Sequence, residues 1–109
     1  MYYHYNQNNS GGSFDVDKNH GITHHVVVEA GSPEEANSRA ESIGLYWDGC
    51  ESGKDCSCCG DRWSKLWSEE KGSDKPIVYG QPAVDHKDIW IKRGSAVAVH
   101  HKRGKIDWY

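Results

Sequence analysis

Residues 46–67 constrain the fold of this chain most strongly, because they hold all four cysteines and three of the five tryptophans. The segment reads Y-W-D-G-C-E-S-G-K-D-C-S-C-C-G-D-R-W-S-K-L-W. Its apolar residues show no periodicity long enough for a full helix or strand. The segment must therefore be fixed by a metal ion, by disulfides, or by aromatic packing against a scaffold.

The cysteine spacing favours a metal. Cys56 and Cys59 have the C-x-x-C spacing of a zinc knuckle, and Gly60 follows directly, where a glycine relieves the strain of the turn. A structural zinc ion is thus the candidate cofactor, with Cys50, Cys56 and Cys59 as predicted ligands and a histidine as the expected fourth. Cys58 is left out, because adjacent cysteines rarely serve one tetrahedral ion together. Two alternatives stay open: reduced cysteines packed among the tryptophans, and a redox or disulfide role.

Composition limits the classes of function. The 109 residues favour a single domain spanning 1–109. The net charge of -3 argues against sequence-independent binding to duplex nucleic acid, which depends on neutralising many phosphates. The first residues do not resemble a secretory signal, and no apolar run is long enough for a transmembrane helix. We therefore expect a cytoplasmic protein without membrane contact, in which four clustered cysteines suggest metal before disulfide.

The remaining sequence predicts an α+β fold, with an antiparallel sheet of about six strands and one main helix on one face. Helix 33–43 has the clearest signals, with Ser32 as N-cap, Glu35 in a capping box and Gly44 as a left-handed C-cap. We expect 1–45 to form a β-meander plus this helix, 46–70 the Cys/Trp-rich connecting loop, and 71–109 a second β-meander. The individual strands are predicted at 2–5, 14–17, 22–30, 76–79, 88–92, 95–101 and 105–109.

Aromatic and basic residues form the candidate ligand-binding set. Trp63 and Trp67 would share a face if 61–69 made a helical turn or two, and that face suits either the core or a stacking platform for a flat ligand. Arginines would then hold the phosphates of a nucleotide. Trp108 and Tyr109 could lie in a homo-oligomer contact. The predicted ligand-binding residues are Tyr3, Tyr5, Trp47, Arg62, Trp63, Trp67, Arg93 and Arg103.

Signals for catalysis are weak. The chain has no H-E-x-x-H, no G-x-S-x-G and no phosphate-cradling glycine loop, so we predict no enzyme and no catalytic residues. Adjacent histidines on a strand, as at 24–25, would point to opposite faces, and His24 could meet His100 across neighbouring strands. A small histidine-dependent hydrolase is the alternative, and it requires both side chains and a carboxylate such as Asp85 or Glu29 in one cleft.

Five stretches in the first two thirds of the chain carry a family resemblance. They read Y-N-Q-N-N-S-G-G-S-F at 5–14, V-V-V-E-A at 26–30, S-P-E-E-A-N at 32–37, I-G-L-Y-W-D-G at 43–49 and D-C-S-C-C-G-D-R-W at 55–63. Together they are similar to a family of small uncharacterised proteins from tailed bacteriophages. That family has no assigned activity, so the resemblance implies no functional residue. It implies a setting in which small proteins without a catalytic motif bind a host component.

Two binding hypotheses follow. In the first, a phage accessory protein in the host cytoplasm neutralises a defence component, either by sequestering a small nucleotide signal or by blocking a host protein. In the second, a zinc-stabilised module contacts single-stranded nucleic acid or a nucleic-acid enzyme, helped by the basic hairpin at 100–105.

Overall fold

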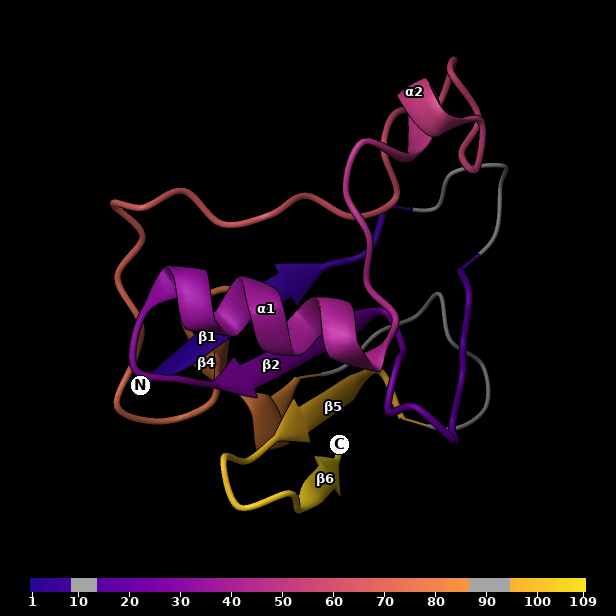
Figure 1. The fold of residues 1–109 in the computed structure, drawn as a ribbon. Coiled ribbons are helices and arrows are strands. Elements are labelled where there is room, and N and C mark those ends of the chain that lie inside the picture. Colours follow the sequence, from indigo (N-terminus) through magenta and orange to yellow (C-terminus); the bar gives the residue numbers. More distant parts are fainter. Residues whose placement is uncertain (9–13, 87–94) are drawn as a thin grey trace.

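Two sheets and one main helix make up the described residues, 1–8, 14–86 and 95–109, of the computed structural model (Figure 1). The helical elements are α1 (Pro33–Ile43), α2 (Gly49–Ser52) and the short 3-10 helix η2 (Ala83–Asp85). A small sheet pairs β3 (Ile77–Val78) with β4 (Gln81–Pro82). The predicted α+β class is confirmed. The main sheet has four strands, hydrogen-bonded in the order β1 (Tyr2–Asn6), β2 (His25–Glu29), β5 (Val97–His100) and β6 (Ile106–Trp108).

The prediction of one antiparallel sheet is wrong, because the main sheet is mixed. Strands β2 and β5 run parallel, with His25 opposite Val97 and Val28 opposite His100, whereas the two outer pairs are antiparallel. Parallel neighbours need a long crossover connection, and the chain between β2 and β5, which includes α1, provides it. Since β3 and β4 form their own hairpin, the main sheet has four strands instead of about six.

Two further local predictions are wrong. The predicted strand 14–17 is wrong, because this segment contributes an isolated bridge between Asp17 and Ile22. The helical turns considered for 61–69 do not form, since this segment is irregular. The predicted strand 88–92 lies outside the described residues. The N-terminal meander is therefore reduced to the antiparallel pair of β1 and β2.

Helix α1 forms as its sequence signals predict. The hydroxyl of Ser32 accepts a hydrogen bond from the Glu35 N–H at 3.1 Å, and the Glu35 carboxylate accepts one from the Gly31 N–H at 2.8 Å. Gly44 ends the helix with a φ of 120°, a conformation that favours glycine, and the Leu45 N–H donates to a carbonyl of the last turn. The chain therefore leaves α1 in a fixed direction, toward the cysteine-rich segment.

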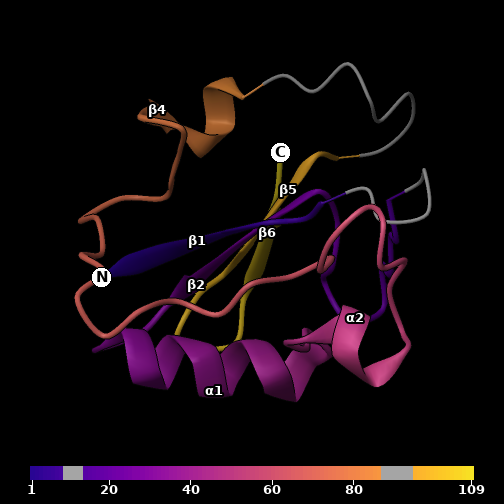
Figure 2. The same ribbon diagram turned by 90° about the horizontal axis from the view of Figure 1, so that it is seen from above.

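Both faces of the main sheet are covered, by α1 on one side and by the β3–β4 hairpin with η2 on the other (Figure 2). Val26 and Val28 belong to the core beneath α1, whereas Val27 packs with Val78 on the opposite side. A strand buried on both faces needs a continuous apolar run, which explains the V-V-V sequence of β2. No helix among the described residues has the length and apolar character to cross a membrane.

Candidate metal centre

A buried carboxylate anchors the cysteine-rich segment. Asp55 accepts hydrogen bonds from the Tyr46 hydroxyl at 2.7 Å and from the Arg62 N–H at 2.8 Å. Gly49, at the start of α2, lies against the same carboxylate, and a Cβ added there would be 1.8 Å from an Asp55 oxygen. The sequence Asp48-Gly49 thus lets the chain turn tightly around Asp55.

Arg62 ties this segment to the main sheet. Its guanidinium donates to the side-chain oxygen of Gln7 at 2.8 Å, and its Nε lies 3.3 Å from the Asp15 carboxylate and 3.7 Å from that of Asp55. The side chain is buried and its charge faces two carboxylates. Arg62, predicted to hold a ligand phosphate, is therefore placed inside the protein as a structural cation.

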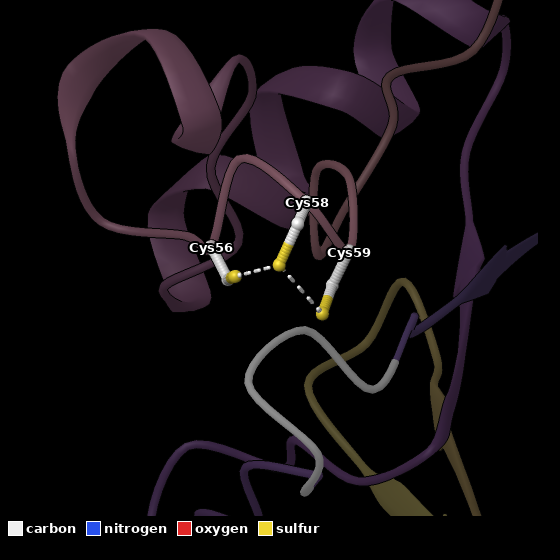
Figure 3. Close-up of side chains that lie close together, drawn as sticks. All are labelled: Cys56, Cys58 and Cys59. Carbon is white, nitrogen blue, oxygen red and sulfur yellow. Dashed lines mark hydrogen bonds between the residues drawn. The ribbon is translucent and has the colours of Figure 1, made fainter.

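Three cysteines meet on one turn (Figure 3). The Sγ of Cys58 lies 2.8 Å from that of Cys56 and 3.8 Å from that of Cys59, and all three sulfurs fall within 4.8 Å of one another. In a tetrahedral zinc site with Zn–S bonds of 2.3 Å, two sulfurs lie about 3.8 Å apart. None of the three cysteines is in a disulfide, so this cluster can hold a metal ion after a small separation of the Cys56 and Cys58 sulfurs.

The backbone of the turn explains why Cys58 joins the cluster. The N–H groups of Cys59 and Gly60 both donate to the Cys56 carbonyl at 3.1 Å, and Gly60 has a φ of 89°. This tight turn brings neighbouring side chains back to one side, against the expectation that Cys58 stays out. Cys50 does not join the three sulfurs, because its thiol donates to the backbone carbonyl of Cys56 at 3.3 Å. The structure thus groups Cys56, Cys58 and Cys59, with Cys58 replacing the predicted Cys50.

Electrostatics distinguish Cys56 from the other cysteines of this segment. Hydrogen bonds from the thiol and N–H of Cys58, and then from those of Cys59, lower the pKa of Cys56 to about 7. The hydrogen bonds of Cys58 with Cys56 and Cys59 raise the pKa of its own thiol to about 11. Burial and the nearby Asp61 carboxylate raise the pKa of Cys50. Because the thiolate is the form that binds a metal, Cys56 is the first ligand of the cluster.

The cluster has three members from this chain. Among the described residues, no histidine or carboxylate joins the three sulfurs, so the histidine predicted as fourth ligand is not found there. Zinc sites with three protein ligands take water or another molecule in the fourth position. Cys58 and Cys59 are exposed, so a fourth ligand can reach the ion from outside.

Residues of this same segment line a pocket of about 210 Å³, the tryptophan pocket. Trp67 is 74% exposed at its rim, whereas Trp63 is 2% exposed and belongs to the core beneath α1. Trp47 lies between these extremes, stacked on Tyr5 at 5.7 Å with its N–H donated to Glu41. Trp63 is therefore a core residue, whereas Trp67 lies on the surface and stays a predicted ligand-binding residue. The pocket is lined by Trp47, Asp48, Asp61, Trp63, Ser64, Lys65 and Trp67.

The other predicted ligand-binding residues lie apart from this pocket. Tyr3 and Tyr5 are buried beneath α1, where the Tyr5 hydroxyl donates to Asn37 at 2.7 Å. Arg103 is exposed in the turn between β5 and β6, at the opposite end of the molecule from α2 (Figure 1). Arg93 lies outside the described residues.

The histidines expected to meet across strands do not. The His100 ring contacts the Gly21 carbonyl at 2.7 Å, whereas the His24 ring stacks on Phe14 at 4.1 Å and on His25 at 4.0 Å. Strand β2 begins only at His25, and the bend before it turns the His24 ring to the same side. The hydrolase site that needed His24 beside His100 is therefore not formed.

Comparison with known families shows which family the chain belongs to. A family model described as "Domain of unknown function (DUF7296)" matches residues 1–109. The chain belongs to the DUF7296 family. A search of the curated proteins and a search of the solved structures each found no match. DUF7296 membership agrees with the expected resemblance to an uncharacterised family, and its description names no activity.

Proposed function

We propose that this DUF7296 protein is a binding protein whose cysteine-rich segment is fixed by a soft divalent ion such as zinc. The observation that carries the proposal is the convergence of three cysteine sulfurs, from Cys56, Cys58 and Cys59, within 4.8 Å on one turn. Asp55 and Arg62 hold the chain on either side of the cysteine turn, where the Arg62 N–H donates to the Asp55 carboxylate. A metal at the thiols would fix the turn between these two residues.

Binding fits this site better than catalysis. Cys58 and Cys59 are exposed, and no cysteine lines the tryptophan pocket or the larger pocket of about 560 Å³ beside Tyr46. A catalytic metal works in a shaped cavity that excludes water. An exposed three-thiolate site is suited to holding a loop or to bridging to a second molecule.

The tryptophan pocket indicates the chemistry of the partner. Its lining includes two acidic residues, Asp48 and Asp61, and one basic residue, Lys65, together with the exposed Trp67. Aromatic faces and carboxylates attract cations. A nucleotide would need basic groups for its phosphates, and Arg62 is buried against carboxylates. A basic side chain of a partner protein therefore suits this pocket better than a nucleotide signal.

The phage setting implied by the sequence resemblance directs the search for that partner. Under this proposal, a host protein with an exposed arginine or lysine is the first candidate, and blocking a component of host defence is the corresponding role. Single-stranded nucleic acid is the second candidate, and its test is a salt-dependent binding curve.

Cobalt titration tests the metal site, because sulfur-to-metal charge transfer appears only when thiolates bind the ion. We expect this absorption in the native protein, and we expect it to disappear in the triple variant C56S/C58S/C59S. The matched control is Cys50→Ser, which removes a cysteine of the same segment and should keep the absorption. Loss of the signal in the Cys50→Ser variant, or its absence in the native protein, would refute the proposed site.

A further inference from the structure

Four histidines gather on the face of the main sheet opposite α1. The His25 ring lies at the centre, with ring centroids at 4.0 Å from His24, 4.5 Å from His86 and 4.9 Å from His4. These residues come from β1, from β2 and the bend before it, and from the residue that ends η2. Three segments distant in sequence thus place three imidazoles around the fully buried His25 ring.

The rings are ready to act as metal ligands. Burial, followed by the charges of the other histidines, lowers the pKa of His4 and of His24 to about 4 and that of His25 to about 2. Neutral imidazole is the form that binds a metal. The Nε2 atom of His4 lies 2.8 Å from the Nδ1 atom of His25, so one ring donates a hydrogen bond to the other. Two ligand-type nitrogens therefore already face each other.

His86 offers a third nitrogen. Its Nε2 atom is buried and has no hydrogen-bond partner among the described residues. Buried polar atoms in proteins are nearly always satisfied, so such an atom calls for an explanation. A metal ion would satisfy it.

Tyr79 adds a strained contact to the cluster. Tyr79 and Gly80 form the turn between β3 and β4, with φ values of 51° and 76°. Such two-residue turns favour Asn-Gly, and a bulky residue at positive φ is uncommon. The Tyr79 ring packs edge-on against His4 at 5.4 Å and His25 at 5.3 Å. Strain of this kind is concentrated at functional sites.

We propose that His4, His25 and His86 bind a divalent transition-metal ion at a second site, separate from the cysteine turn. Imidazole ligands suit zinc, copper and nickel. With metal–nitrogen bonds of 2.0–2.1 Å, two ligand nitrogens lie about 3.3 Å apart, so the His4–His25 pair opens by about half an ångström. When the metal binds, the histidine that donated this hydrogen bond moves its proton to its other ring nitrogen. No proton is therefore released.

Binding also requires His86 to turn. Among the described residues, only the three cysteines have three ligand atoms within 4.8 Å of one another. The three histidine nitrogens are therefore farther apart before the ion binds, and they move together when it does. His86 stands at the end of a three-residue helix, and rotation of its side-chain torsions can redirect its Nε2 atom. The site shares no residue with the cysteine turn, so either proposal can fail without the other.

Histidine-labelled NMR of the C56S/C58S/C59S variant, titrated with zinc chloride, tests this site. We expect about one equivalent of zinc to bind and to shift the ring nitrogens of His4, His25 and His86. His20, which is exposed and bonded to Asp17, should not move. Zinc that binds without shifting the three ring nitrogens, or no binding at all, would overturn the proposal.

Two single variants keep the test decisive if the triple variant does not fold. His86→Gln should weaken zinc binding at this site by more than about tenfold, while His20→Gln should leave it unchanged. In the full chain the same comparison is made by counting bound zinc. The expected result is about two ions in the native protein and about one in His86→Gln. Equal counts in both would contradict the histidine site.

Discussion

At the scale of single residues, Trp67 is the most informative side chain, because it is 74% exposed beside two carboxylates. We predict that Trp67→Ala weakens binding of arginine amide by roughly two- to fivefold, the value of one exposed cation–π contact. The free energy of unfolding of this variant should change by less than about 0.5 kcal/mol, because the exposed side chain makes few packing contacts. Fluorescence titration gives the affinity, and Trp108→Ala, on the distant β6, is the matched control. Equal weakening in both variants would contradict a specific role for the pocket.

At the scale of elements, α1 holds the main sheet and the cysteine-rich segment together, and its first turn depends on Ser32. We predict that Ser32→Ala lowers the free energy of unfolding by about 1 kcal/mol, because the Glu35 N–H loses its acceptor. Urea unfolding measures this change. Ser38→Ala, an exposed substitution within the same helix, should be neutral or slightly stabilising. A loss in Ser38→Ala as large as that in Ser32→Ala would show that the cap is not the cause.

At the scale of the whole molecule, the buried histidines make stability depend on pH. Burial keeps the pKa of His4, His24 and His25 at about 4, 4 and 2, below the value of about 6.5 in the unfolded chain. As pH falls from about 6.5 toward 4, the unfolded state takes up protons that the folded state does not, so stability decreases. We predict a urea midpoint, measured with a chelator present, that is constant above neutral pH and falls steadily below it. His4→Gln should show a shallower fall, and an unchanged midpoint across this range would contradict the burial of the cluster.

Part of this protein can be predicted from the sequence, because the relevant forces are local. The capped helix α1, the α+β class and the Gly60 turn follow from residues that contact their near neighbours in the chain. The presence of a cysteine cluster that can hold a metal ion also follows from the C-x-x-C-G spacing, since Cys56 and Cys59 lie on one turn. Its membership does not, because whether Cys50 or Cys58 completes it depends on how the turn closes.

Tertiary structure alone decided the rest, because it depends on contacts between distant segments. The parallel pairing of β2 with β5 is set by burial on both faces of the main sheet, and no local pattern distinguishes it from an antiparallel pair. Arg62 was indistinguishable from a ligand-binding arginine until Asp15, Asp55 and Gln7 surrounded it. The gathering of His4, His25 and His86 likewise required β1, β2 and η2 to converge, so the sequence determined which histidines were available and the fold determined which of them meet.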